Sequence, residues 1–248
     1  MINQKNTAII IPVRLASTRL PNKPLLLINN KPMVLHVWER AVESSLGRVI
    51  VATDSNEIGD IILKNGGEYC MTSESHQSGS DRIYEALNKS KNSSDIEFII
   101  NLQGDLPNIQ INNLSLVLNL LEDPEADIGT LVANIDTEDE YQNYNVVKAL
   151  CNFNPNKNST FANDFIRSPL NKFRNNLYHH IGIYSYKRKS LEKFVNLEQS
   201  LKEKEFKLEQ LRAMDNEMKI KAALIDFLPI GVDTLEDLAQ IKKIMEIK

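Results

Sequence analysis

Apolar runs of strand length recur along the chain, and in its first half they alternate with segments of helical periodicity. Several runs are almost continuously apolar, which is typical of strands that are buried on both faces of a sheet. The alternation predicts an α/β protein whose mostly parallel sheet is flanked by helices. In such folds, ligands bind beyond the carboxyl ends of the strands. The expected strands are residues 8–12, 48–53, 98–103, 128–135, 145–151, 180–186 and 220–226, and the expected helices include residues 55–65, 80–90, 110–121 and 188–217.

Two further helices are marked by the residues that begin them. Pro32 suits the first turn of a helix because its fixed φ matches helical backbone. Near the end of the chain, Thr234 and Asp237 have the spacing of a capping box, which predicts that the last helix begins there. The apolar stripe expected on the helix after Pro32 comprises Val34, Val37, Trp38, Ala41 and Val42.

The middle of the chain has a different pattern. Residues 127–186 hold three strand-length runs, but the stretch 152–176 is rich in asparagine and poorly patterned. We interpret this part as an antiparallel subregion, at about residues 127–186, inserted into a single domain of residues 1–248. One α/β domain of that length is common.

The composition is that of a soluble globular protein. Of the 248 residues, 42% are apolar and 25% are charged, and the formal net charge is −4. A nucleic-acid partner would call for a basic excess, which the composition lacks, and no apolar stretch approaches the roughly 18 residues needed to span a bilayer. Cys70 and Cys151 lie far apart in strand-like runs, which favours small buried thiols over a disulfide. These features predict a cytoplasmic protein without a membrane span.

A cationic tract follows the first expected strand, at the edge of the sheet where ligands bind. It contains Arg14, Arg19 and Lys23, and it lacks both the GxxxxGK[ST] loop and the GxGxxG turn. Arginine binds phosphate oxygens through two parallel hydrogen bonds, and lysine acts as a point charge. Three cations on one loop therefore match a polyanion such as a triphosphate, although a solvated surface loop can have the same composition.

The tract belongs to a series of motifs that resembles one enzyme family. The motifs occur in order over nearly the whole chain: IIPVRLASTRLPNKPLLLINNKPMVLHVWERA, VIVATDSNEI, MTSESHQSGSDRIYEAL, INLQGDLP, NVVKA, HIGIYSY, LEQLR and GVDTLEDL. They are similar to those of the 3-deoxy-manno-octulosonate cytidylyltransferases, also called CMP-Kdo synthetases. The resemblance implies a Rossmann-like nucleotidyltransferase fold with a smaller antiparallel subregion for dimerisation and sugar binding. It also implies a homodimer that transfers CMP from CTP to Kdo for lipopolysaccharide biosynthesis, releasing pyrophosphate.

The resemblance further implies which residues bind nucleotide and metal. Asp105 and Asp233 fall on the metal-binding positions of the family, and Mg²⁺ commonly has one or two carboxylate ligands beside water and phosphates. On the sequence alone, each aspartate is also a common turn or capping residue, and the segment from Ser80 to Arg82 is compatible with a helix cap. The implied catalytic residues are Arg14, Arg19, Lys23 and Asp105, and the implied nucleotide-binding residues are Arg14, Ser17, Arg19, Lys23, Ser80, Arg82 and Gln103.

The sugar site is implied by the later motifs, where the match is less complete. Leu106 stands where the family has an acidic residue, His179 replaces an arginine, and residues 200–212 differ in several positions. Asn30 replaces a glycine, and we expect it to have a left-handed backbone, which asparagine tolerates. The implied sugar-binding residues are Gln103, Arg167, His180, Tyr184, Glu209 and Gln210.

Two other functions stay open at this point. One is a cytidylyltransferase for another acid sugar, such as sialic acid, but the first loop of those enzymes is rich in glycine, whereas this chain has STRLPNKP. The other is a nucleotide-binding protein that has lost catalysis, for which the departures at the sugar site are the only support. A zinc site is disfavoured because the histidines lack ligand spacing.

Overall fold

The computed structural model describes residues 1–16, 20–169 and 171–246. By its internal contacts the chain divides into two compact units, Met1–Ser115 with Pro229–Lys248, and Leu116–Leu228. The subregion expected at about residues 127–186 lies within the second unit. The number of domains stays a prediction.

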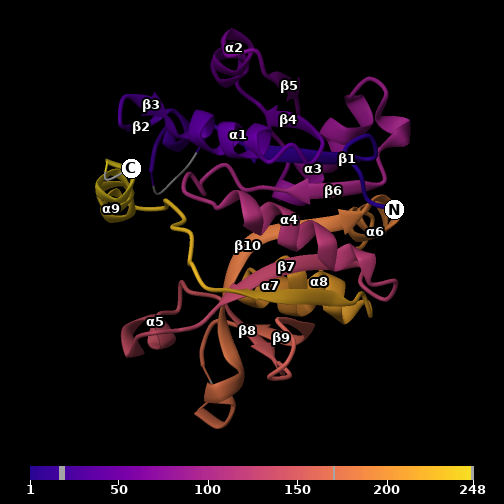
Figure 1. The fold of residues 1–248 in the computed structure, drawn as a ribbon, viewed down its shortest axis with the longest axis vertical. Coiled ribbons are helices and arrows are strands. Elements are labelled where there is room, and N and C mark those ends of the chain that lie inside the picture. Colours follow the sequence, from indigo (N-terminus) through magenta and orange to yellow (C-terminus); the bar gives the residue numbers. More distant parts are fainter. Residues whose placement is uncertain (17–19, 170, 247–248) are drawn as a thin grey trace. The chain divides into compact units, whose positions relative to one another are not determined.

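The first unit is built on four parallel strands in the order β5-β4-β1-β6 (Figure 1). Every residue of β1 is buried, as expected for a strand covered on both faces. β5 is the strand-like run around Cys70; it was not among the expected strands of the sheet, because it is short, contains Glu68 and is only half-buried. The strands are β1 (Thr7–Val13), β4 (Arg48–Thr53), β5 (Glu68–Met71) and β6 (Phe98–Asn101).

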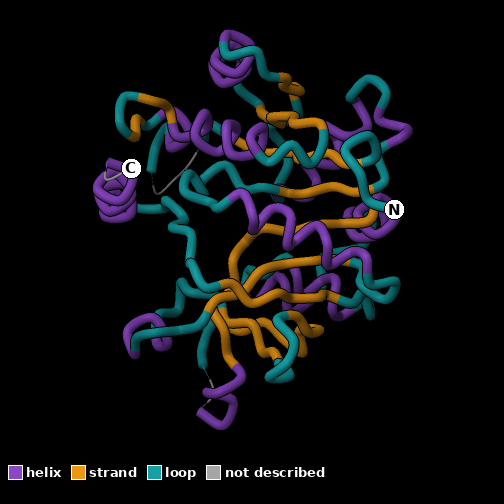
Figure 2. Tube along the Cα trace, viewed as in Figure 1, coloured by secondary structure: helices purple, strands orange, loops and turns teal. Residues whose placement is uncertain are grey.

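Helices follow these strands in the expected alternation (Figure 2). In this unit, α1 and α3 pack against β1 and β4, and α2 packs against β4 and β5. The helix after Pro32 forms, but one member of its predicted apolar stripe is wrong. Val42 is 45% exposed, whereas Met33 and Leu35 are buried, because the buried face lies nearer the beginning of the helix. The helices are α1 (Met33–Glu43), α2 (Asn56–Lys64), α3 (Gly79–Lys89) and α9 (Leu235–Glu246).

A small hairpin lies between the first loop and α1. Its strands β2 (Leu27–Ile28) and β3 (Lys31–Pro32) pair in antiparallel register, so that Asn29 and Asn30 form a two-residue turn. Both asparagines have positive φ, at 49° and 64°, which a tight turn of this kind requires. The left-handed backbone expected at Asn30 is therefore confirmed.

The second unit is a mostly antiparallel set of five strands in the order β10-β7-β11-β9-β8, in which β8 also pairs with β10. Only β7 and β11 run parallel among these pairs. The sequence did not predict β9, because its pattern is polar and half-buried and lies within the asparagine-rich stretch. The strands are β7 (Ile128–Ala133), β8 (Lys148–Cys151), β9 (Ser159–Ile166), β10 (Leu177–Lys187) and β11 (Ile220–Ile225).

Shorter elements complete the chain. The charged segment 188–217, expected to be helical, contains three short helices, and Lys207 at the end of α7 has a φ of 52°, which ends that helix. No helix among the described residues is both long and apolar enough to cross a membrane. The remaining elements are α4 (Ile111–Asn119), α5 (Glu138–Gln142), α6 (Arg188–Val195), α7 (Leu201–Phe206), α8 (Gln210–Asp215), and the 3₁₀ turns η1 (Lys23–Leu25), η2 (Ser93–Asp95), η3 (Leu120–Glu122) and η4 (Asn171–Asn176).

Candidate active site

A polar pocket of about 340 Å³ opens in the first unit, where β1 and β6 end. Its wall includes Pro12 and Val13 from the end of β1 and the segment from Gln103 to Asp105 that follows β6. The pocket therefore lies at the carboxyl edge of the parallel strands, where the fold predicts a ligand. Among the predicted site residues, those that line it are Arg14, Lys23, Arg82, Gln103, Asp105 and Asp233.

Lys23 joins the two aspartates whose metal-binding role is implied by the resemblance. Its Nζ donates to Asp105 Oδ2 at 2.7 Å and to Asp233 Oδ1 at 3.0 Å. Burial alone would lower the pKa of Lys23, but the charges and hydrogen bonds of Asp105 and then Asp233 raise it above its ordinary value. Two carboxylates from distant segments therefore converge on one cation.

The backbone holds the two acidic turns together. Val232 N donates to Asp105 O at 3.0 Å, so the segment before Asp233 is bonded to the turn that carries Asp105. The capping box predicted at Thr234 forms: Thr234 Oγ1 accepts from Asp237 N at 3.1 Å, and Asp237 Oδ2 accepts from Thr234 N at 2.8 Å. Asp237 Oδ2 also accepts from Asp233 N at 3.0 Å, which fixes the backbone at the second acidic residue.

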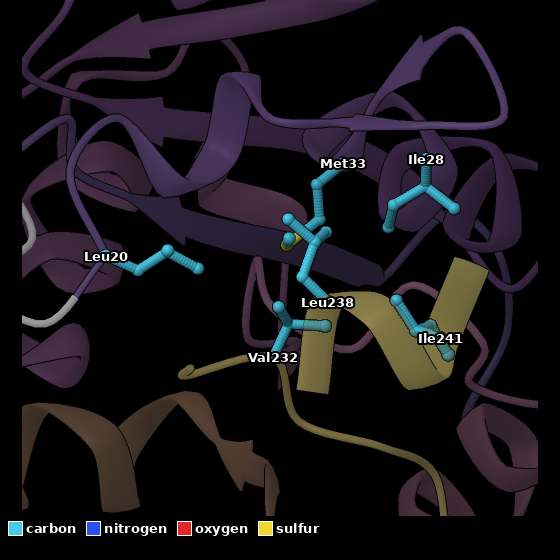
Figure 3. Close-up of a cluster of buried hydrophobic side chains, with 6 residues drawn as sticks. All are labelled: Leu20, Ile28, Met33, Val232, Leu238 and Ile241. Carbon is cyan, nitrogen blue, oxygen red and sulfur yellow. The ribbon is translucent and has the colours of Figure 1, made fainter. Parts of the chain in front are cut away.

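An apolar cluster anchors the loop of Lys23 to the helix that follows Asp233 (Figure 3). Leu20 lies shortly before Lys23, and Val232 directly precedes Asp233. Burial of these side chains is favourable and non-directional, so it brings the two loops together, while the hydrogen bonds set the geometry. The cluster comprises Leu20, Ile28, Met33, Val232, Leu238 and Ile241.

The turn after β6 depends on a glycine. A Cβ added to Gly104 would lie 2.8 Å from Val13 Cγ2 and 3.3 Å from Pro12 O, so a larger residue would push the turn away from the end of β1. Beside it, Gln103 Nε2 donates to Asn101 Oδ1 at 3.0 Å. The QGD motif therefore brings the Gln103 amide and the Asp105 carboxylate to the pocket through a close backbone approach.

The beginning of α3 contributes Arg82 to the pocket, but not Ser80, the other residue of this helix that was predicted to bind nucleotide. Ser78 is the N-cap: its Oγ accepts from Asp81 N at 3.1 Å and donates to Asp81 Oδ2 at 2.9 Å. Arg82 lines the pocket, whereas Ser80 is buried and is not among its lining residues. Within the segment from Ser80 to Arg82, only Asp81 takes part in this cap, and the cap residue itself is Ser78. The binding role of Ser80 stays a prediction.

Sequence reasoning missed the loop before α3, which also lines the pocket through His76 and Gln77. Glu85 holds this loop: its Oε2 accepts from Ser73 N at 2.8 Å and contacts His76 Nε2. Burial tends to raise the pKa of Glu85. Hydrogen bonds from Lys89, Ser73 and His76 outweigh this effect and lower the pKa to about 2. His76 precedes α3, and Glu85 lies within that helix, nine residues later. This spacing forms no pattern from which their contact could be predicted.

Known proteins place this chain in a family. A family model described as cytidylyltransferase matches residues 8–220. The 3-deoxy-manno-octulosonate cytidylyltransferase of Paramagnetospirillum magneticum is 43% identical over 238 residues, which is 96% of this chain and 97% of that protein. The chain belongs to the 3-deoxy-manno-octulosonate cytidylyltransferase family. The enzyme of that name from Brucella canis is 46% identical over 96% of this chain and 95% of its own length.

Solved structures agree with this family and its fold. A CMP:2-keto-3-deoxy-manno-octonic acid synthetase complexed with CTP matches with a TM-score of 0.87 at 34% identity, covering 97% of this chain and 98% of that one. The 4-diphosphocytidyl-2C-methyl-D-erythritol synthase of Anaerococcus prevotii matches with a TM-score of 0.66 at 12% identity over 98% of this chain and 99% of that one, which supports the fold alone. The nucleotidyltransferase-like α/β fold predicted from the sequence is confirmed.

Of the remaining positions implied by the cytidylyltransferase family, the described ones are not among the lining residues of this pocket. Ser17 and Arg19 lie outside the described residues. Arg167 belongs to the second unit and donates to three backbone carbonyls, those of Phe206 at 2.7 Å, Lys207 at 3.2 Å and Tyr144 at 3.3 Å. In this structure its guanidinium connects separate loops of that unit, and its role toward a sugar stays a prediction.

The other predicted sugar residues also lie in the second unit. His180 Nε2 pairs with Thr130 Oγ1 at 3.0 Å, and its ring lies near those of Phe165 and Tyr184, with centroids 4.9 Å and 5.5 Å away. Burial, together with the charge of the neighbouring His179, lowers the pKa of His180 to about 3, so the imidazole is neutral near pH 7. Glu209 and Gln210 lie at the beginning of α8. Sugar binding by these residues stays a prediction.

The acidic pair fits a divalent cation. Asp105 and Asp233 present carboxylate oxygens to a single cation, and hard oxygen ligands are those that Mg²⁺ prefers. Across the described part of the chain, no group of three or more histidine, cysteine, aspartate or glutamate residues is placed to hold a metal. Mg²⁺ needs no such cage, because it commonly completes its coordination with water and substrate phosphates.

Proposed function

We propose that this chain transfers the cytidylyl group of CTP to Kdo, releasing pyrophosphate and supplying CMP-Kdo for lipopolysaccharide biosynthesis. The observation that carries the proposal is the convergence of Lys23, Asp105 and Asp233 in a pocket at the ends of β1 and β6. Cations match a triphosphate, and paired carboxylates match its metal ion. Membership in the 3-deoxy-manno-octulosonate cytidylyltransferase family, and the CTP of the solved relative, support this substrate pair.

In this proposal the first loop binds the triphosphate. Arg14 and Lys23 line the pocket, and Arg19 follows in the same loop. Phosphoryl-group transfer requires little covalent chemistry from the protein, so the rate comes from alignment and from neutralising charge on the leaving pyrophosphate. Ser17 would contribute a hydroxyl to the same loop, and Gln103 would contact both the nucleotide and the sugar.

Asp105 and Asp233 would hold Mg²⁺ in this proposal. When bound, this ion would neutralise negative charge on the phosphates and make the attacking hydroxyl more acidic. Lys23 already bonds to both carboxylates, so its ammonium and a divalent cation compete for the same oxygens. Once the carboxylates have another counter-ion, Lys23 is available to pair with phosphate.

The reaction balances without a covalent enzyme intermediate. The anomeric hydroxyl oxygen of Kdo forms a bond to the α-phosphorus of CTP, and the bond from that phosphorus to the bridging oxygen of pyrophosphate breaks. The hydroxyl proton passes to solvent. The residues of this chain align the two substrates and bind the charge that accumulates on the leaving group.

On the acceptor side, we propose that Arg167 pairs with the carboxylate of Kdo. The polar groups of His180, Tyr184, Glu209 and Gln210 would hydrogen-bond its hydroxyls. A neutral His180 is consistent with such a contact, because a neutral imidazole has one nitrogen that donates and one that accepts. The homodimer and the cytoplasmic location implied by the family complete the proposal.

The test is an assay of pyrophosphate release with purified protein, CTP and Mg²⁺. We expect release with Kdo and little with sialic acid, and little when UTP replaces CTP. Release with sialic acid alone would indicate a cytidylyltransferase for another acid sugar. Binding of CTP without pyrophosphate release in the presence of either sugar would indicate a protein that has lost catalysis.

A further inference from the structure

A buried ion pair lies directly behind the pocket, and none of the motifs above gives it a function. Arg82 Nη2 donates to Asp54 Oδ2 at 2.8 Å, and the two side chains are 4% and 10% exposed. Arg82 Nη1 donates to Thr72 Oγ1 at 2.7 Å. Arg82 also lines the pocket, whereas Asp54 and Thr72 are not among its lining residues.

The second oxygen of the same carboxylate binds the first loop. Asp54 Oδ1 accepts from Leu15 N at 3.3 Å, directly after Arg14, which lines the pocket. One carboxylate thus bonds to two segments that are far apart in the sequence, the loop after β1 and the first turns of α3. Both segments contribute a cation to the pocket wall.

The support for Asp54 is itself rigid. Asp54 lies between the end of β4 and the N-cap of α2, where Ser55 N donates to Thr53 Oγ1 at 3.2 Å. Thr72 is held against the same strand end, because its backbone N and its Oγ1 donate to Thr53 O at 2.8 Å and 3.2 Å. Groups that are locked by their own hydrogen bonds can hold a ligand-binding side chain in one geometry.

We propose that Asp54, assisted by Thr72, is a positioning residue for the nucleotide: it holds Arg82 and the beginning of the first loop in the geometry that binds CTP. The proposal rests on the proposed function, since it takes CTP as the ligand of this pocket. A guanidinium has five N–H donors, so donors remain for the nucleotide beyond the two bonds to Asp54 and Thr72.

The experiment measures CTP affinity by calorimetry in the presence of Mg²⁺, and KM for each substrate in the pyrophosphate assay. Asp54→Asn keeps an oxygen for Leu15 N but removes the charge that orients Arg82. We expect CTP to bind about 10- to 100-fold more weakly, the range for loss of a charge-assisted hydrogen bond. KM for Kdo should change less than about twofold, because the predicted sugar residues other than Gln103 lie in the second unit.

Three comparisons separate positioning from folding. Glu68→Gln is the matched control, because it breaks the Arg48–Glu68 ion pair in the same sheet, away from the pocket, and should leave CTP affinity unchanged. In Asp54→Asn/Arg82→Gln, the loss of affinity should equal that of Arg82→Gln alone, since Asp54 acts through Arg82. If Asp54→Asn does not fold, Thr72→Val removes a partner of Arg82 without leaving an unpaired charge and should weaken CTP binding several-fold.

The results distinguish this inference from the proposed function. If the wild-type protein does not bind CTP, the proposed function fails. If it binds CTP and Asp54→Asn or Thr72→Val binds it equally well, the positioning role is overturned while the function stands. Additive losses in the double variant, or equal losses of affinity for CTP and Kdo, would also overturn it, because they indicate a general structural effect.

Discussion

At the scale of single residues, the site is organised around charges that neutralise one another before any substrate is present. Lys23 lies 2.7 Å from Asp105 and 3.0 Å from Asp233, which keeps two carboxylates close without strong repulsion. Such an arrangement preorganises the acidic pair for a divalent cation. In the proposed function the cost would be competition, because the ammonium would have to give up these bonds for Mg²⁺ to bind.

The acidic pair can be tested by removing one negative charge. Asp105→Asn and Asp233→Asn should each lower kcat at least about 100-fold, because the lost contribution is stabilisation of charge in the transition state. The free energy of unfolding should change by no more than about 1 kcal/mol, since the pair is partly exposed. Turnover is measured across a Mg²⁺ titration and stability by urea unfolding. Asp60→Asn, on the exposed side of α2, is the control. A wild-type kcat for Asp105→Asn and Asp233→Asn at saturating Mg²⁺ would refute the metal-binding role of these aspartates.

A second variant tests the competition for the carboxylates. Lys23→Met leaves Asp105 and Asp233 without their cation, so the melting temperature in the absence of metal should fall. Millimolar Mg²⁺ without nucleotide should then raise the melting temperature of the variant more than that of the wild type. Thermal melts with and without Mg²⁺ measure both effects. Lys31→Met, which breaks the Lys31–Glu39 pair, is the control and should show no such rescue. If Mg²⁺ raised the melting temperatures of the wild type and of Lys23→Met equally, the prediction would be contradicted.

At the scale of elements, two connections determine the shape of the pocket. The loop before α3 is held by Glu85, and the turn after β6 is held by the close approach of Gly104 to β1. The first connection joins α3 to the loop that precedes it, and the second joins the ends of the paired strands β1 and β6. Their disruption should therefore alter nucleotide binding without changing Arg14 or Lys23, which we propose to bind the phosphates.

Glu85 gives a prediction for the dependence of stability on pH. Its pKa is lowered from 4.5 to about 2, so its contribution to stability is present above about pH 4.5 and is lost as the pH falls toward 2. Glu85→Gln should be less stable near pH 7 by roughly 1 kcal/mol, and its stability should change less than that of the wild type across this window. Urea unfolding at several pH values measures the difference. Parallel pH profiles for the two proteins would show that Glu85 does not contribute.

The close approach of Gly104 to β1 can be tested by adding a side chain at this position. Gly104→Ala should cost about 1 to 3 kcal/mol of stability, because its Cβ would lie 2.8 Å from Val13 Cγ2. It should also raise KM for CTP by displacing Gln103 and Asp105. Gly231→Ala is a control in the neighbouring turn, since its Cβ meets nothing closer than Leu106 Cδ2 at 3.9 Å. Equal stability of the two variants, measured by thermal melts, would contradict this account.

At the scale of the whole molecule, the predicted substrates divide between the two units. The described residues assigned to nucleotide and metal all belong to the unit of Met1–Ser115 and Pro229–Lys248. The residues assigned to the sugar belong to Leu116–Leu228, apart from Gln103.

Hydrogen exchange tests this division. CTP with Mg²⁺ should slow amide exchange in the segments around Arg14, His76 and Asp105, because bound nucleotide suppresses local opening there. Kdo should slow exchange in the segments around His180 and Glu209. Mass spectrometry of peptic fragments, with each substrate added separately, gives the readout. Protection by CTP confined to Leu116–Leu228 would contradict the assignment.

Some of these features were accessible from the sequence because they depend on local patterns. The continuous apolar run of β1, the capping box at Thr234 and the left-handed backbone at Asn30 each form as predicted, since backbone preference and burial act over a few residues. By contrast, β9 and the exposure of Val42 depend on which neighbours cover a residue. Periodicity alone does not specify those neighbours.

By itself, the sequence determined the α/β class, the loop of cations after the first strand and the family to which its motifs belong. Only the tertiary structure decided that Lys23 bonds to both Asp105 and Asp233, residues 82 and 210 positions away. It alone also placed Asp54 between Arg82 and Leu15. The reason is physical: apolar burial is non-directional and leaves a readable pattern, whereas these charged contacts arise where distant loops meet and have no period in the sequence.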